Sequence, residues 1–165
     1  MISNKQSPHK KTIVGLAVAA MWLAASAVSA GECPADKRVA DGQGQTHVAH
    51  AAKGGSDTVR TAIDLGHDAP ALKDHVFRLR QLEIEPGGIV PWHSHAERPA
   101  QIYVIKGTVT EYASNCAVPI VHKAGDVAPE THATSHWWQN TGKDAARLIS
   151  VDILHDTANA DKKMM

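Results

Sequence analysis

Apolar and polar residues alternate from His75 onward, which is the pattern of β-strands with one buried face. Phe77 and Leu79 alternate with arginines, whereas Leu82 and Ile84 alternate with glutamates. The apolar phase changes between Leu79 and Leu82, so in a regular strand the apolar residues would switch faces there. The pattern therefore predicts two strands, or one strand with a β-bulge, in this region.

Further short strand-like runs continue to residue 154 and are separated by turn-forming residues. The predicted strands are 89–95, 101–105, 108–112, 120–122, 136–140 and 146–154. We expect a turn at Pro86–Gly88, a hairpin across Lys106–Gly107, and a last hairpin across Thr141–Asp144. Short antiparallel strands at this spacing predict an all-β barrel or sandwich.

The first 30 residues have the features of a secretory signal peptide. Three lysines precede an almost wholly apolar run at 13–27, and Val28-Ser29-Ala30 offers small side chains to a signal peptidase. Cleavage there would make Gly31 the first mature residue, and a cut after Ala27 is the close alternative. A retained membrane anchor is the other alternative, because about 18 apolar residues almost suffice to span a bilayer. Cleavage would give a periplasmic or secreted protein without stable membrane insertion.

The charge balance argues against a nucleic-acid partner. The full chain has 17 basic and 17 acidic residues. The signal segment holds three of the lysines and no acid, so the mature chain is mildly acidic. The sequence contains no basic stripe of the kind that contacts phosphates.

The mature chain is long enough for one domain with a core. Residues 31–73 are rich in Ala, Gly and Asp and are expected to form a partly irregular N-terminal extension. The barrel is expected at 74–156, followed by a C-terminal tail at 157–165. Cys33 of the extension and Cys116 of the barrel are the only cysteines. An even count in an oxidising compartment favours a Cys33–Cys116 disulfide over two free thiols.

Three histidines have a spacing that suits metal ligands. His93 and His95 are two residues apart in a predicted strand, so both side chains point to one face. Two imidazoles aimed at one point suit a first-row metal ion, which needs at least a third ligand. His136, which begins the strand at 136–140, is the candidate. We predict one divalent ion at this site, of Fe, Mn, Zn, Ni or Cu.

The same residues resemble the two sequence motifs of a small single-domain cupin. The first motif is matched in register by Gly87, His93, His95 and Gly107. The second is matched by Gly125, His136 and Asn140, with Thr131 and Ala133 in place of a proline and a glycine. The resemblance covers about residues 81–153. It implies a double-stranded β-helix, the cupin jelly-roll barrel, and a homodimer.

The chain departs from the cupin pattern at the fourth metal ligand. Ala100 occupies the position of the family's metal-binding glutamate. Glu97 has the same strand parity as His93 and His95, and is our prediction for the fourth ligand. Gln101 could serve only if a β-bulge turned it inward, and water or substrate are the remaining alternatives.

The resemblance leaves two classes of function open, since cupins include metal enzymes and plain binding proteins. The first is an exported metal-dependent oxygenase or isomerase-like enzyme that acts on a small organic acid. The second is a non-catalytic periplasmic protein that binds a small ligand or a metal. A site without its acidic ligand would carry more positive charge, which favours an anionic small molecule as the partner.

Overall fold

The computed structural model describes residues 31–46, 51–132 and 134–155. Its helices are η1 (Ala35–Lys37), α1 (Leu65–Asp68) and η2 (Pro70–Leu72). Its strands are β1 (Lys53–Asp64), β2 (His75–Ser94), β3 (Ala100–Lys106), β4 (Thr108–Ala113), β5 (Ile120–Lys123), β6 (Val127–Glu130), β7 (Ser135–Gln139) and β8 (Ala146–His155). The predicted signal peptide and C-terminal tail lie outside the described residues. No helix within those ranges is long and apolar enough to cross a bilayer.

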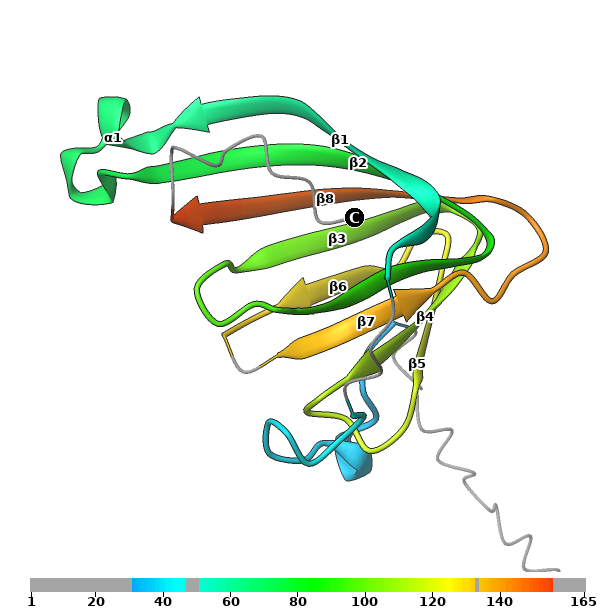
Figure 1. Ribbon diagram of the computed structural model, residues 1–165. Coiled ribbons are helices and arrows are strands. Elements are labelled where there is room, and N and C mark those ends of the chain that lie inside the picture. The colour runs from blue at the N-terminus through cyan, green and yellow to red at the C-terminus, as the bar shows by residue number, and fades with distance from the viewer. Residues whose placement is uncertain (1–30, 47–50, 133, 156–165) are drawn as a thin grey trace, which may run out of the picture.

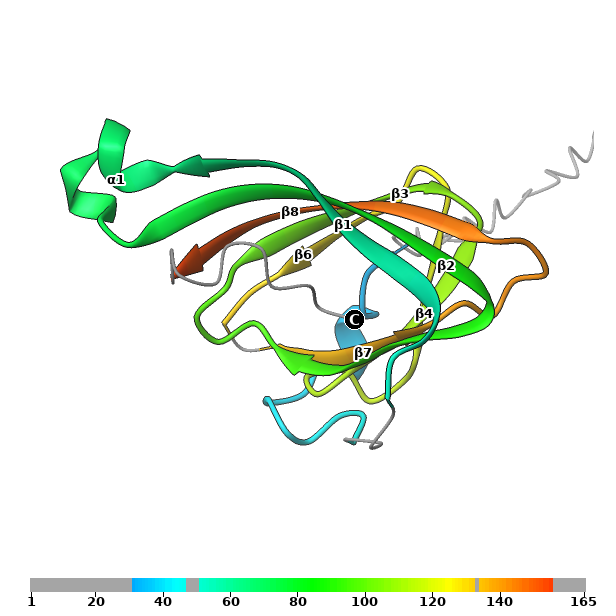
Figure 2. The same cartoon turned by 45° about the horizontal axis from the view of Figure 1, so that its top comes forward.

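The strands form one sheet that folds over itself into a nearly closed barrel. Its order is β5-β4-β7-β2-β8-β3-β6, and β1 pairs along β2. Figures 1 and 2 show β1, β2, β8, β3 and β6 side by side, with β7, β4 and β5 on the opposite side. The long strand β2 joins both sides, because it pairs with β8 through residues 75–84 and with β7 through 89–94. The predicted all-β barrel is confirmed.

β2 is continuous where the sequence predicted an interruption. Its register with β8 runs without a shift through residues 75–84, so the prediction of a break or bulge between Leu79 and Leu82 is wrong. The inward positions before Leu82 carry Arg78 and Arg80, which are only 1% and 2% exposed. The buried face therefore stays the same along the strand, and only its chemistry changes from charged to apolar.

The two predicted hairpins are also wrong, because the strands on either side of each predicted turn do not pair with each other. β3 pairs with β6 and β8, whereas β4 pairs with β5 and β7. Gly107 is thus a corner between the two sides of the barrel. Its φ is +88°, and a Cβ there would lie 2.7 Å from Cα of Ala146, so the corner requires glycine. β7 and β8 likewise do not pair with each other, although both pair with β2.

The turn predicted at Pro86–Gly88 lies inside β2. Figure 1 shows β2 bending there as it passes from one side of the barrel to the other. The left-handed conformation at Gly87, with φ +72°, allows this bend without the steric penalty of a side chain.

The core fills the space between the two sides of the barrel. It consists of Leu82, Ile84, Val90, Ile102, Val104, Val109, Ala128, Trp138, Ala146 and Leu148. A smaller cluster surrounds Cys116, which forms the predicted disulfide with Cys33. The bridge confirms that pairing and ties the start of the extension to the barrel. The extension also supplies β1, a 12-residue strand in a region with weak sequence signals.

Candidate metal centre

The three predicted histidines come together at one end of the barrel. His93 lies near the end of β2 and is directly opposite His136 of β7 in the antiparallel register. His95 follows β2, and its backbone N–H donates to the carbonyl of Thr134 at 2.9 Å. His95 and His136 are almost fully buried, at 1% and 0% exposure. The pairing of β2 with β7 therefore brings a residue 41 positions away in sequence to the H-x-H pair.

Their Nε2 atoms converge on one point. The separations are 3.1 Å between His93 and His95, 3.1 Å between His95 and His136, and 2.9 Å between His136 and His93. Each Nδ1 atom instead lies within hydrogen-bond distance of an oxygen. The partners are the carbonyls of Pro91 at 2.8 Å and Arg98 at 2.7 Å, and the Glu111 carboxylate at 2.7 Å.

This arrangement fits a metal ion. A carbonyl or carboxylate oxygen can only accept, so each Nδ1 is placed to donate its proton to one, and the Trp138 indole N–H also points at Nδ1 of His136, at 3.1 Å. In the neutral ring the Nε2 lone pair is then free, and three lone pairs face one another at about 3 Å. Their repulsion is relieved by a cation placed between them, and imidazole nitrogen is a good ligand for first-row metals. The hydrogen bonds at Nδ1 are the supporting contacts that metal-binding histidines usually have.

The pKa values in the metal-free site follow from burial and the neighbouring charges. Burial, and then the charge of His136, holds the pKa of His93 well below its usual value. The same two causes lower the pKa of His95 to about 3. Burial would lower the pKa of His136 too, but the nearby Glu130 and Glu111 carboxylates outweigh it and raise this pKa.

Glu111 is a functional candidate that the sequence pattern did not reveal. It lies in β4 and is 4% exposed. Its Oε1 contacts Nδ1 of His136, and its Oε2 lies 2.8 Å from Nε2 of His122. Burial alone would raise its pKa, but hydrogen bonds from His122 and His136 lower the pKa to about 2. His122 in turn stacks on Trp138 with ring centroids 4.5 Å apart. These contacts hold the His136 ring in its orientation.

Glu130, at the end of β6, is a second buried carboxylate beside His136. Its Oε2 lies 3.4 Å from His136 Nδ1, while its Oε1 makes no hydrogen bond within the described part of the chain. Burial raises its pKa to about 8. Ligand atoms of Glu111, Glu130 and His136 all lie within 4.8 Å of one another. No local pattern pointed to this residue, because a glutamate in a short strand normally faces solvent.

A cluster of buried charges lies behind the histidines. Arg78 donates two hydrogen bonds to Asp152, both at 2.9 Å, and Arg98 donates to the same carboxylate at 2.9 Å. Arg80 pairs with Asp57 and lies 3.2 Å from Asp152. Three guanidinium groups thus face two carboxylates, which leaves one formal positive charge. Arg80 Nε and Arg98 Nη2 have no hydrogen-bond partner among the described residues.

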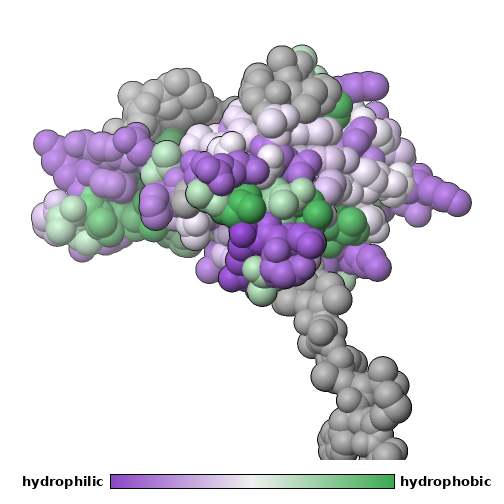
Figure 3. Space-filling view, turned by 90° about the horizontal axis from the view of Figure 1, so that it is seen from below, coloured by the Kyte–Doolittle hydropathy of each residue, from purple (hydrophilic) through white to green (hydrophobic). Residues whose placement is uncertain are grey.

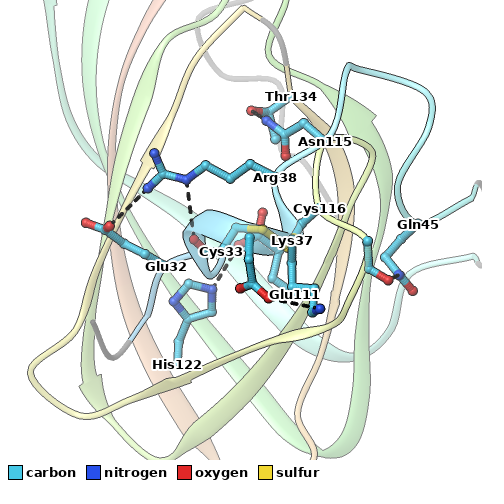
Figure 4. Close-up of a disulfide and its surroundings, with 12 residues drawn as sticks. Glu32, Cys33, Lys37, Arg38, Gln45, Glu111, Asn115, Cys116, His122 and Thr134 are labelled. Atoms are coloured by element: carbon cyan, nitrogen blue, oxygen red, sulfur yellow. Dashed lines mark hydrogen bonds and ion pairs between the residues drawn. A yellow bond between two sulfur atoms is a disulfide. The ribbon is translucent and has the colours of Figure 1, made fainter. Parts of the chain in front are cut away.

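Two cavities border the residues around this site. The inner one, of about 20 Å³, is lined by His93 and His95 together with Arg80, Ser150, Trp138 and the apolar core. A space of this size holds about one or two water molecules. The outer one, of about 310 Å³, is bounded by Glu111, Glu130 and the segment that begins at Gly31. Figure 4 shows this segment, held by the Cys33–Cys116 disulfide, next to Glu111 and His122.

The two sequence-based candidates for a fourth ligand do not join this cluster. Glu97 is exposed in the turn after His95, and Gln101 is exposed on the outer face of β3. The described His, Cys, Asp and Glu side chains that gather near these histidines do not include Glu97. Its role as a ligand stays a prediction. Ala100 is buried and faces the barrel interior, as its position in the motif implies.

Comparisons with known proteins identify the barrel. No curated protein matches the sequence, but the profile of the cupin domain family matches residues 80–152. A predicted oxalate decarboxylase from Thermotoga maritima aligns at 18% identity and a TM-score of 0.52, over 74% of this chain and 98% of that one. The cupin domain of Schizosaccharomyces pombe Cnp3 aligns at 20% identity and a TM-score of 0.43, over 49% of this chain and 57% of that one.

An oxalate oxidase with bound glycolate aligns at 18% identity and a TM-score of 0.47, over 67% of this chain and 59% of that one. This chain therefore spans little more than half the length of two of these three structures. The T. maritima structure, at a TM-score of 0.52 and 18% identity, shows a shared fold alone and leaves the chemistry to the site itself. With the family profile, the strand order and the two histidine-bearing motifs in agreement, residues 80–152 form a cupin domain of the type-2 family.

Proposed function

We propose that this protein is an exported metalloprotein that acts on a small organic acid, as an oxygenase or an isomerase-like enzyme. The observation that carries the proposal is the convergence of three Nε2 atoms within 3.1 Å of one another. Three nitrogen ligands leave coordination positions open, as in reactive rather than structural sites. A bound first-row ion would supply Lewis-acid or redox chemistry there.

The charges around the inner cavity support an anionic substrate. Arg80 lines this cavity with His93 and His95, and its Nε has no hydrogen-bond partner among the described residues. The buried cluster around it has one more guanidinium than carboxylates. An uncompensated buried charge is costly, so an anion entering the cavity would be stabilised.

The test combines elemental analysis with a screen for turnover. Protein purified without chelators should contain about one first-row ion per chain. Oxygen uptake and product formation are then measured with small carboxylic and phenolic acids. Oxalate comes first, because the T. maritima neighbour is named for it. Turnover that requires the ion supports the proposal, and metal-loaded protein that converts none of these acids contradicts its enzymatic part.

The second candidate is a non-catalytic periplasmic protein that binds a metal or a small ligand. The size of the inner cavity favours it, because about 20 Å³ admits little beyond the ion and a water molecule. Under this alternative, calorimetry should detect binding of the metal or of a small carboxylate, with no chemical change in the ligand.

Export is the part of the proposal that concerns residues 1–30. The disulfide supports it, because such bonds persist in oxidising compartments. We expect the periplasmic protein to begin at Gly31 and to have a mass two hydrogens below that of the reduced mature chain. A mass that still includes the leader would contradict cleavage.

A homodimer is the assembly that we propose. Tyr103 and Val127 are directly opposite on β3 and β6 and are each 47% exposed, and Ile105 beside them is 42% exposed. Figure 3 shows such apolar patches, set between polar groups, on one face of the molecule. Sedimentation equilibrium should give twice the chain mass, and Tyr103→Asp should give the monomer. A monomeric wild-type protein would rule the dimer out.

A further inference from the structure

Glu130 is the buried acidic group whose environment is least explained by the rest of the barrel. The residue is 3% exposed, and its Oε1 has no hydrogen-bond partner among the described residues. A buried carboxylate without partners is costly, so such groups normally have a cation or a donor beside them. Oε2 lies beside His136, but the described residues supply no partner for Oε1.

The position of Glu130 places it next to His136, one of the three histidines. In the antiparallel ladder of β3 and β6 it is directly opposite Ala100, and both residues are buried. Directly opposite side chains lie on the same face of a sheet, so both point into the barrel. Ala100 is small and leaves space for the carboxylate. Glu130 also lies beside the His136 ring, with Oε2 3.4 Å from Nδ1.

The local charges call for an acidic group at this place. A divalent ion on three neutral imidazoles would keep its full charge, and the arginine cluster behind it already has a formal excess of one positive charge. Glu111 is engaged with both His136 and His122. Glu130 is the remaining buried carboxylate near His136 with an uncommitted oxygen.

We propose that Glu130 supplies the carboxylate ligand of the metal held by His93, His95 and His136. The inference rests on the proposed function, since it presupposes the three-histidine ion. It assigns to β6 a role that the sequence prediction gave to Glu97. Coordination requires the carboxylate to turn from the Nδ1 side of His136, where it lies in this structure, toward the Nε2 side.

The first experiment measures zinc affinity by competition with a chromophoric chelator. Glu130→Gln keeps the shape of the side chain and should weaken binding about tenfold or more, in the range of 10–100-fold that groups around a metal typically contribute. Glu83→Gln, at an exposed ion pair with Arg147, is the matched control and should leave the affinity unchanged. Wild-type affinity in Glu130→Gln, or a larger loss in Glu97→Gln, would overturn the assignment.

The second experiment moves the carboxylate across the strand pair. Ala100→Glu combined with Glu130→Gln should restore most of the lost affinity, because the two positions face the same space. A residue that only positions His136 through Nδ1 could not be replaced in this way, so absence of rescue in a folded double variant counts against the inference.

A third measurement does not depend on how the double variant folds. Infrared difference spectra on adding zinc should show a carboxyl band of the wild-type protein that is missing in Glu130→Gln. A spectrum identical to that of the wild-type protein would contradict the inference. So would a second bound ion that disappears in Glu130→Gln while the first remains.

These results separate the two proposals. If His93→Ala abolishes zinc binding and Glu130→Gln does not weaken it, the three-histidine site stands and the role of Glu130 falls. If His93→Ala leaves zinc binding unchanged, the proposed metal centre itself is wrong.

Discussion

The Glu111 carboxylate accepts a hydrogen bond from Nδ1 of His136 at 2.7 Å, and this contact determines which nitrogen of the ring faces the other histidines. Because Nδ1 carries the proton, Nε2 is left with a lone pair directed at Nε2 of His93 and His95. Glu111 itself is held by His122 at 2.8 Å. Two residues that would not contact the metal thus prepare one of its ligands.

Glu111→Gln should therefore weaken metal binding without removing a ligand. An amide can present its N–H to His136 and favour the wrong tautomer, so we expect a loss of about 10–100-fold in zinc affinity. Chelator competition measures it. Glu83→Gln, which alters the exposed ion pair with Arg147, is the control. Unchanged affinity in a folded Glu111→Gln protein would show that this contact does not prepare the site.

Asp152→Asn should destabilise the barrel strongly. Asp152 is 1% exposed and neutralises Arg78 and Arg98, so its loss leaves buried guanidinium groups uncompensated. Breaking a buried pair in this way typically costs about 3–5 kcal/mol of unfolding free energy. Arg147→Ala breaks the exposed pair with Glu83 and should cost about 1 kcal/mol or less. Urea unfolding measures both, and equal costs would refute the account of the cluster.

Gly107→Ala should cost more stability than Gly87→Ala. Both glycines have positive φ, at +88° and +72°, so an alanine is strained at either site by about 1–2 kcal/mol. A Cβ at Gly107 would also meet Ala146 at 2.7 Å, whereas at Gly87 it meets nothing within 4 Å. Thermal unfolding of the two variants makes the comparison. A larger loss of stability in Gly87→Ala than in Gly107→Ala would show that close packing at the corner is not the reason for glycine at position 107.

The stability of the metal-free protein should depend on pH in two opposite ways. The pKa of His95 is lowered from 6.5 to about 3, so its contribution is full above pH 6.5 and is lost as the pH falls toward 3. The pKa of Glu130 is raised from 4.5 to about 8, so its contribution is full below pH 4.5 and is lost as the pH rises toward 8.

Urea unfolding midpoints measured between pH 4 and 8 test both effects, with one variant for the acid side of the profile and one for the alkaline side. His95→Gln should flatten the acid side of the profile, and Glu130→Gln should flatten the alkaline side. A wild-type slope that neither substitution changes would mean that other groups control the pH dependence.

The sequence predicted the parts of this site that have a regular spacing. His93 and His95 are two residues apart, and the pattern around His136 resembles a known motif, so all three could be named before the fold was known. The Cys33–Cys116 bridge followed from the cysteine count. Glu111, His122 and Glu130 could not be named, because each is a polar residue in a strand whose inward direction depends on barrel closure.

The mistaken strand predictions have a related physical cause. Arg78 and Arg80 were expected to face solvent, since charged side chains are rarely buried unless paired. Their partners Asp57 and Asp152 lie 23 and 74 positions away, so the pairing is invisible in the local pattern. The hairpins failed because β3 and β4 pair with other strands and not with each other, and the same holds for β7 and β8.

Metal occupancy of three single variants tests the central claim most directly. The wild-type protein and His93→Ala, His95→Ala and His136→Ala are each loaded with zinc, passed through a desalting column and analysed for zinc per chain. We predict about one ion in the wild-type protein and a strong loss in each variant, because each removes one of few protein ligands. The exposed His67→Ala, in α1, should keep the ion. A wild-type protein that retains no zinc, iron, manganese, nickel or copper, or three variants that retain as much as the wild type, would contradict the metal centre.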